Sequence, residues 1–203
     1  MSGAGGTSGT ASGTSSSLTC TSTGGLPLNA AYLASPGNPG AGGYVYAFSD
    51  AGGSAATIGV TQFCGCGTNV AQNPPTYSDF GGGIGVNVNQ DQAVGLDGGA
   101  SMPEPFAATG TGLSYALTSV PAAGLRVQIY TSDMGPTVPY CVEATEAIAT
   151  IPWTMFNTKC QDSPSDGVAP SGAPADLTKI EFLVPAVASA ESWDFCVTQV
   201  GFQ

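Results

Sequence analysis

The chain has no histidine, only three lysine and arginine residues together, and few charged residues of either sign, 8% of the total. Without histidine, the serine–histidine–aspartate and cysteine–histidine forms of nucleophilic catalysis have no general base. Histidine-based metal sites lack their ligands for the same reason. The formal net charge of −11 gives no electrostatic attraction for nucleic acid or an anionic membrane. We therefore expect a neutral or cationic ligand, or a metal cation.

Long apolar runs are also missing, since none approaches the ~20 residues that a membrane span needs. We expect no membrane insertion. What the 203-residue chain has instead is abundant glycine and proline, 30 and 15 residues. A polar surface with little charge is typical of secreted β-proteins. Residues 1–19 are almost pure Gly, Ser, Thr and Ala, which predicts a flexible linker or tether before a single domain at 20–203.

The cysteine content favours an oxidising compartment, and therefore a secreted or extracellular protein, with a cell-surface tether as one form of it. The six cysteines are Cys20, Cys64, Cys66, Cys141, Cys160 and Cys196. Zinc binding is the rival interpretation, but only the first pair after Cys20 is closely spaced and no histidine is present. We expect disulfide bonds, whose connectivity the spacing alone leaves open.

Short segments of alternating apolar and polar residues, separated by Gly, Pro and Asn, predict an all-β domain. The expected strands are Gly43–Asp50, Ala55–Phe63, Gly82–Gln90, Gly112–Thr118, Gly124–Tyr130, Thr178–Pro185 and Ser192–Phe202. One or two short extended segments are expected in Cys141–Pro152, an irregular stretch in Cys64–Ser78, and at most a helical turn in Leu26–Ala34 or Trp153–Asn157. Strands of this number and spacing predict a β-sandwich of the jelly-roll type, built from two antiparallel sheets.

The stretch Gly124–Asp133 alternates most clearly, with apolar side chains on one face. Its other face carries a guanidinium, an amide and a phenol: Arg126, Gln128 and Tyr130. Arg126 is the only arginine of the chain. Two interpretations remain open for it, a contact with a neutral ligand or a salt bridge that holds a neighbouring strand.

Carbohydrate binding needs flat aromatic rings for the C–H faces of a sugar and planar polar groups for its hydroxyls. Beyond the three side chains above, the candidates are Tyr44, Tyr46, Asn87 and Asn89, the asparagines if their strand neighbours Gly124–Tyr130. Structural Ca²⁺ is a further expectation, with Asp50 and Asp194 as candidate ligands. A glycosidase would need a pair of carboxylates. No pair stands out among Glu104, Glu143, Glu146, Glu181 and Glu191.

Six segments occur in an order that resembles a known family: GGYVYAFSD, FGGGIGVNVNQ, GLRVQIYTSD, ATIPWTMFNTKCQD, DLTKIEFLVPA and WDFCVTQVGF. They resemble the galactose-binding-like jelly-roll domains of secreted bacterial, myxobacterial-type proteins. These domains are similar to carbohydrate-binding modules such as family 11. The resemblance covers roughly Gly40–Gln203. It implies two antiparallel sheets, sugar bound on a concave face, and often a structural Ca²⁺.

By this resemblance, Arg126, Gln128 and Tyr130 lie in the concave cleft, and Tyr44 or Tyr46 contributes an aromatic ring. The chain departs from the family in its last strand, where Thr198 and Gln199 replace a usual pair of aspartates. With this fold in mind, the favoured bridges are Cys141–Cys160, Cys20–Cys196 and Cys64–Cys66.

The resulting prediction is a secreted, non-catalytic carbohydrate-binding module that recognises a neutral polysaccharide. The alternative is a structural subunit of an extracellular filament or surface layer, self-assembling through residues 1–19, which pack on a neighbouring copy. A glycosidase on the same fold is the third hypothesis.

Overall fold

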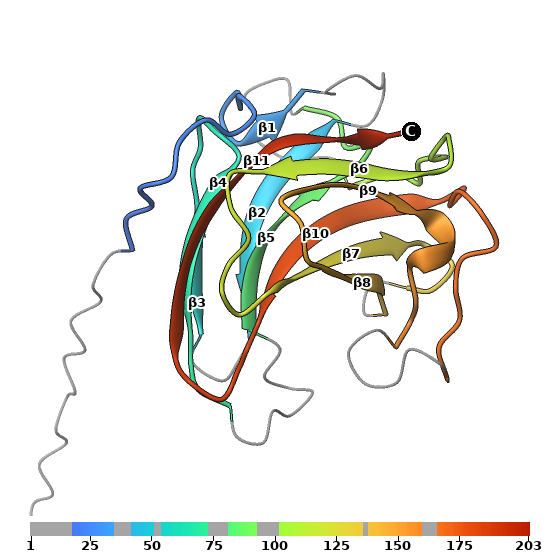
Figure 1. The fold of residues 1–203 in the computed structure, drawn as a ribbon. Helices are drawn as coiled ribbons and strands as arrows, with labels where there is room; N and C mark the ends of the chain where they lie inside the picture. The colour runs from blue at the N-terminus through green and yellow to red at the C-terminus, as the bar shows by residue number, and fades with distance from the viewer. Residues whose placement is uncertain are drawn as a thin grey trace, which may run out of the picture.

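The computed structural model describes residues 18–34, 42–50, 54–72, 81–92, 102–135, 138–159 and 166–203. Their strands form two antiparallel sheets that pack face to face (Figure 1). The all-β sandwich expected from the sequence is confirmed. Among the described residues, no helix has the length and apolar character of a membrane span.

The larger sheet has six strands in the order β1-β2-β5-β10-β7-β8. They are β1 (Tyr32–Leu33), β2 (Gly43–Ser49), β5 (Gly81–Asn87), β10 (Leu177–Pro185), β7 (Leu125–Thr131) and β8 (Tyr140–Ala144). The smaller sheet has five strands in the order β3-β4-β11-β6-β9. They are β3 (Ala55–Ile58), β4 (Cys64–Asn69), β11 (Glu191–Phe202), β6 (Gly112–Leu117) and β9 (Ile148–Pro152). A 3-10 turn, η1 (Trp153–Met155), follows β9.

The core lies between the two sheets and follows from the alternation of the strands. In β10 the apolar side chains of Ile180, Phe182 and Val184 point inward and are buried. The Phe182 ring meets Phe63 and Tyr115 on the facing side at centroid distances of 6.4 and 6.0 Å. Because inward and outward positions alternate, Lys179, Glu181 and Leu183 project from the opposite face of the same strand.

The helical turn expected in Leu26–Ala34 or Trp153–Asn157 is present in the second segment as η1. Leu26–Ala34 instead turns back at Ala30 and Ala31, which have positive φ, and then forms β1. One local expectation is wrong. The region after Phe63 is not irregular throughout, since Cys64–Asn69 forms β4. Its inward positions are glycines, because Ile84 and Trp193 occupy the space where a Cβ of Gly65 or Gly67 would lie. The strand therefore lacks the apolar alternation by which the others are recognised.

The expected Cys20–Cys196 and Cys64–Cys66 bridges are wrong. The structure pairs Cys20 with Cys66 and Cys64 with Cys196. On an extended strand, side chains two residues apart point the same way and stand about 7 Å apart, too far for a mutual bridge. Each cysteine of β4 therefore bonds to a neighbouring segment, and Cys64 lies directly opposite Cys196 of β11.

The expected Cys141–Cys160 bridge involves Cys160, which lies outside the described residues. Cys141 itself is disulfide-bonded, and no cysteine in the described ranges is free. These bonds are compatible with an extracellular protein. Residues 1–17 also lie outside the described part, so the tether and the self-assembly assigned to residues 1–19 stay predictions.

Candidate functional site

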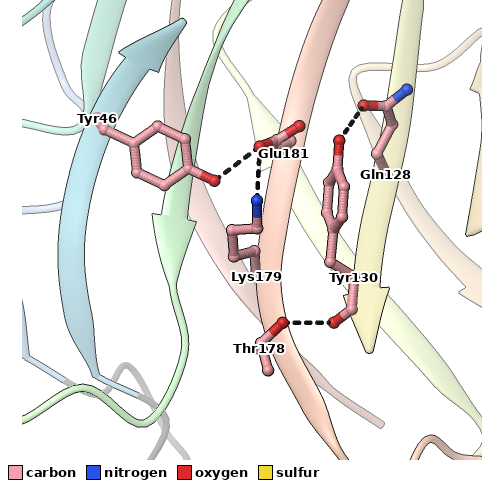
Figure 2. Close-up of polar contacts among 6 residues, drawn as sticks. All are labelled: Tyr46, Gln128, Tyr130, Thr178, Lys179 and Glu181. Carbon is pink, nitrogen blue, oxygen red and sulfur yellow. Dashed lines mark hydrogen bonds and ion pairs between the residues drawn. The ribbon is translucent and has the colours of Figure 1, made fainter. Parts of the chain in front are cut away.

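The face of the six-stranded sheet that is turned away from the core brings side chains of four neighbouring strands together. Antiparallel register aligns Tyr46 of β2 with Gly85 of β5, Glu181 of β10 and Gln128 of β7. In the next row along the strands, the register places Lys179 between two polar residues, Asn87 and Tyr130. We call the surface formed by Tyr46, Gln128, Tyr130, Lys179 and Glu181 the polar–aromatic face (Figure 2).

Glycine at position 85 is what allows Tyr46 to reach the centre of this face. A Cβ at Gly85 would lie 2.8 Å from Cζ of Tyr46 and 2.9 Å from Cγ of Glu181. The Tyr46 ring therefore extends across β5, over the position where a side chain of residue 85 would stand. Figure 2 shows the ring leaving β2 and pointing toward Glu181 on β10.

Glu181 is the buried centre of the face, with only 5% of its surface exposed. The Tyr46 hydroxyl donates a hydrogen bond of 2.8 Å to its Oε1, and Nζ of Lys179 lies 3.9 Å from the same oxygen. Burial raises the pKa of the Glu181 carboxyl above its ordinary value, against the lowering effect of the Tyr46 hydrogen bond and the Lys179 charge. Burial and the Glu181 charge raise the pKa of Tyr46, so its hydroxyl stays a donor.

Tyr130 borders the same cluster from β7. Its ring lies under the Lys179 ammonium, with Nζ 4.0 Å from the ring centroid, a cation–π contact. Its hydroxyl donates a 3.4 Å hydrogen bond to Oε1 of Gln128, as Figure 2 shows. Tyr46, Tyr130 and Lys179 each keep part of their surface exposed.

Arg126 forms the salt bridge that was one of its two interpretations. Its Nε donates to Oε1 of Glu143 over 2.8 Å, which joins β7 to the edge strand β8. The Glu143 side chain is half exposed, so the pair contributes less than about 1 kcal/mol. A ligand contact by Arg126 stays a prediction.

The asparagines of the expected site are separated by the observed sheet order. The strands β5 and β7 are not neighbours, since β10 lies between them. Asn87 shares the outward face and donates from Nδ2 to Gln90. The strand predicted at Gly82–Gln90 is too long at its end, because β5 stops at Asn87. Asn89 follows it in a turn, with a φ of 52°. Tyr44 is at the edge of the face, where its ring meets that of Tyr32 edge-on.

The two aspartates proposed as calcium ligands belong to different sheets, Asp50 after β2 and Asp194 in β11. Asp50 is buried and accepts hydrogen bonds from Ser54 and from the Gly81 amide. Asp194 accepts the amide and hydroxyl of Thr21 and the amide of Ser22. Partial burial alone would raise the pKa of Asp194, but these hydrogen bonds together lower it. Calcium binding stays a prediction.

Sequence reasoning placed Tyr46, Gln128 and Tyr130 in the candidate site but did not select Glu181 or Lys179. Glu181 was one of several glutamates in the glycosidase hypothesis. A signal for it exists, because an acidic residue stands between the apolar Ile180 and Phe182, at an outward position of a strand. Its burial could not be read from the sequence, since Tyr46 comes from a strand 135 residues away.

Replacing Glu181 with glutamine should remove part of the pH dependence of stability. A carboxyl whose pKa is raised by folding contributes stability that is complete below about pH 4 and is lost as the pH rises through the folded-state pKa. Glutamine cannot ionise, and its amide oxygen still accepts from Tyr46. We expect the free energy of unfolding of Glu181→Gln, relative to the wild type, to increase between pH 4 and pH 7 in urea titrations. The contribution of Asp194 to the pH dependence is the same in both proteins and cancels in the comparison. Equal pH dependence in both proteins would contradict this assignment.

The arrangement can hydrogen-bond hydroxyl groups through planar polar side chains and can stack two aromatic rings on an apolar ligand surface. Its charges are paired, Lys179 with Glu181 and Arg126 with Glu143. Comparison with protein-family models gives no match to this chain, and comparison with curated protein sequences gives none either.

Proposed function

We propose that the chain is a secreted, non-catalytic module that binds a neutral polysaccharide on its polar–aromatic face. The observation that carries this proposal is the convergence of Tyr46 and Tyr130 on either side of the Glu181 carboxyl, with Gln128 beside them. Sugars present alternating C–H faces and hydroxyl groups, which suit such a mixture of rings and planar polar groups. The resemblance to galactose-binding-like domains points to the same class of ligand.

Charge supports a neutral ligand over a polyanion. The cations of the polar–aromatic face and its border, Lys179 and Arg126, are each paired with a glutamate. The whole chain carries a net charge of −11, which repels polyanions at long range. A neutral glycan needs no free cation for binding and is not repelled by the net negative charge.

The attachment of the N-terminal segment also suits a tethered binding module. Cys20 forms a disulfide bond with Cys66 of β4, and the Thr21 hydroxyl donates a hydrogen bond to Asp194 of β11, so this segment is attached to the five-stranded sheet. The polar–aromatic face belongs to the other sheet and looks away from the core. A tether formed by residues 1–19 would therefore hold the module from the side opposite its ligand.

The test is retention of purified protein on a panel of insoluble and soluble neutral polysaccharides, β-glucans first. We expect Tyr130→Ala to weaken retention about tenfold, because it removes one of the two rings, and roughly 1–1.5 kcal/mol per stacked ring corresponds to that change. Tyr130→Phe is the matched control, since it keeps the ring and removes only the hydroxyl. Absence of retention of the wild type on every polysaccharide would refute the proposal, as would equal retention of the Tyr130→Ala variant.

A further inference from the structure

The two described disulfide bonds meet on one short stretch of β4. Cys66 is bonded to Cys20 in the N-terminal segment, and Cys64 is bonded to Cys196 in β11. Only Gly65 separates the two bonded positions of β4. A continuous covalent line therefore runs from Cys20 to Cys66, back two residues to Cys64, and across to Cys196.

This line bypasses nearly the whole domain. The bridges close loops with sequence separations of 46 and 132 residues. Every strand of the six-stranded sheet lies inside one of these loops, β1 and β2 in the first and β5, β7, β8 and β10 in the second. The polar–aromatic face is therefore not part of the covalent connection between Cys20 and Cys196.

Noncovalent contacts reinforce the same junction. The Asp194 carboxylate, two residues before Cys196, accepts hydrogen bonds of 2.6 and 2.8 Å from the amide and hydroxyl of Thr21. Further along, the Leu26 amide donates 2.8 Å to the carbonyl of Val197. The residues before Cys20 have the Gly/Ser/Thr composition of a flexible linker, which transmits tension without resisting bending.

We propose that the paired bridges are a load path, which lets the chain bear tension between its N-terminal linker and the end of β11 while the six-stranded sheet stays folded. Tension requires an attachment on each side of the bridges. One is an anchor reached through residues 1–19, and the other is a contact made by the residues after Cys196. Tension entering at Cys20 passes through two disulfide bonds and the Cys64–Cys66 backbone, all covalent. This inference is independent of the polysaccharide proposal, since it holds for any ligand of the face.

Single-molecule stretching of the full chain, held by handles at both termini, tests the load path. We expect the oxidised protein to lengthen in a step of only ~2 nm as Val197–Phe202 peels from β6, at up to ~3.5 Å per residue. A dithiol reductant added under tension should then release two discrete steps. Opening Cys20–Cys66 frees about 15 nm and opening Cys64–Cys196 about 45 nm on the same scale. In each opening, one reductant thiolate attacks a sulfur and the second reductant thiol resolves the mixed disulfide, leaving two protein thiols and a cyclic oxidised reductant.

Variants distinguish the two bridges without depending on complete reduction. The Cys20→Ser, Cys66→Ser double variant should show only the shorter step without reductant. Cys141→Ser is the matched control, because Cys141 lies in β8 within the bypassed part, and we expect no long step from it. A step of 15 nm or more in the oxidised wild type overturns the proposal. So does a reduced protein that lengthens no further than the oxidised one at equal force, because the sheets and not the bridges would then carry the load.

Discussion

Replacing Phe182 with alanine is expected to lower the free energy of unfolding by about 4 kcal/mol, the largest effect of any single side chain considered. Phe182 is completely buried in β10, near the middle of the six-stranded sheet. Its ring meets Phe63 and Tyr115 edge to face, and Tyr115 belongs to the opposite sheet. Truncation would leave a cavity between the two sheets that neither rigid neighbour can fill. Urea denaturation at neutral pH measures the change.

A matched control separates this position from aromatic contacts in general. Phe106 is only partly buried and stacks on Phe202 at the rim of the core, with 5.5 Å between ring centroids. We expect Phe106→Ala to cost about half as much or less, since its site can relax toward solvent. Comparable losses at both positions would show that Phe182 has no special place between the sheets.

The sequence was sufficient for strands whose two faces differ in chemistry. In β7, the alternation of Val127 and Ile129 with Arg126 and Gln128 reports both the strand and its orientation, and the structure agrees. The same logic fails in β4, because Gly65 and Gly67 hold the inward positions. What excludes larger side chains there is Trp193 and Ile84, which are distant in sequence. Local pattern cannot report a space that other segments fill.

The candidate site was predictable in part for the same reason. Tyr46 and Tyr130 could be assigned to outward faces from their own strands alone. Sheet order is not local information, and the insertion of β10 between β5 and β7 is what puts Glu181 at the centre. The burial of Glu181, and with it the raised pKa of its carboxyl, depends on that order. The predicted cysteine pairing was wrong for the same reason, because the observed pairing follows from Cys64–Asn69 being a strand, which the sequence did not indicate.

A methyl group added at Gly85 should abolish most ligand binding while leaving the fold intact. The Cβ of Gly85→Ala would come within 2.9 Å of the Tyr46 hydroxyl and of Cγ of Glu181, and within 2.8 Å of the ring. The tip of a tyrosine can swing away, so the cost to stability is limited to about 1–3 kcal/mol, the cost of depriving the buried Glu181 carboxyl of this hydrogen bond. The ring then no longer lies over β5, and we expect retention on the recognised polysaccharide to fall about tenfold or more.

The neighbouring Gly82→Ala shows whether that loss comes from the face or from β5 itself. The Cβ of this variant would point toward the other sheet, 3.6 Å from Ala56 and 3.3 Å from both the Asn69 amide oxygen and the Phe48 carbonyl oxygen, so these neighbours need to shift by only a few tenths of an ångström. It leaves Tyr46 and Glu181 untouched, so retention should equal that of the wild type. Affinity electrophoresis through gels containing the polysaccharide, beside urea denaturation of both variants, gives the two readouts. If Gly85→Ala binds normally at near-native stability, the position of Tyr46 over β5 does not matter for recognition, and the ligand must contact the face nearer to Tyr130. If both variants lose binding equally, the loss comes from a change in β5 and not from the displaced Tyr46 ring.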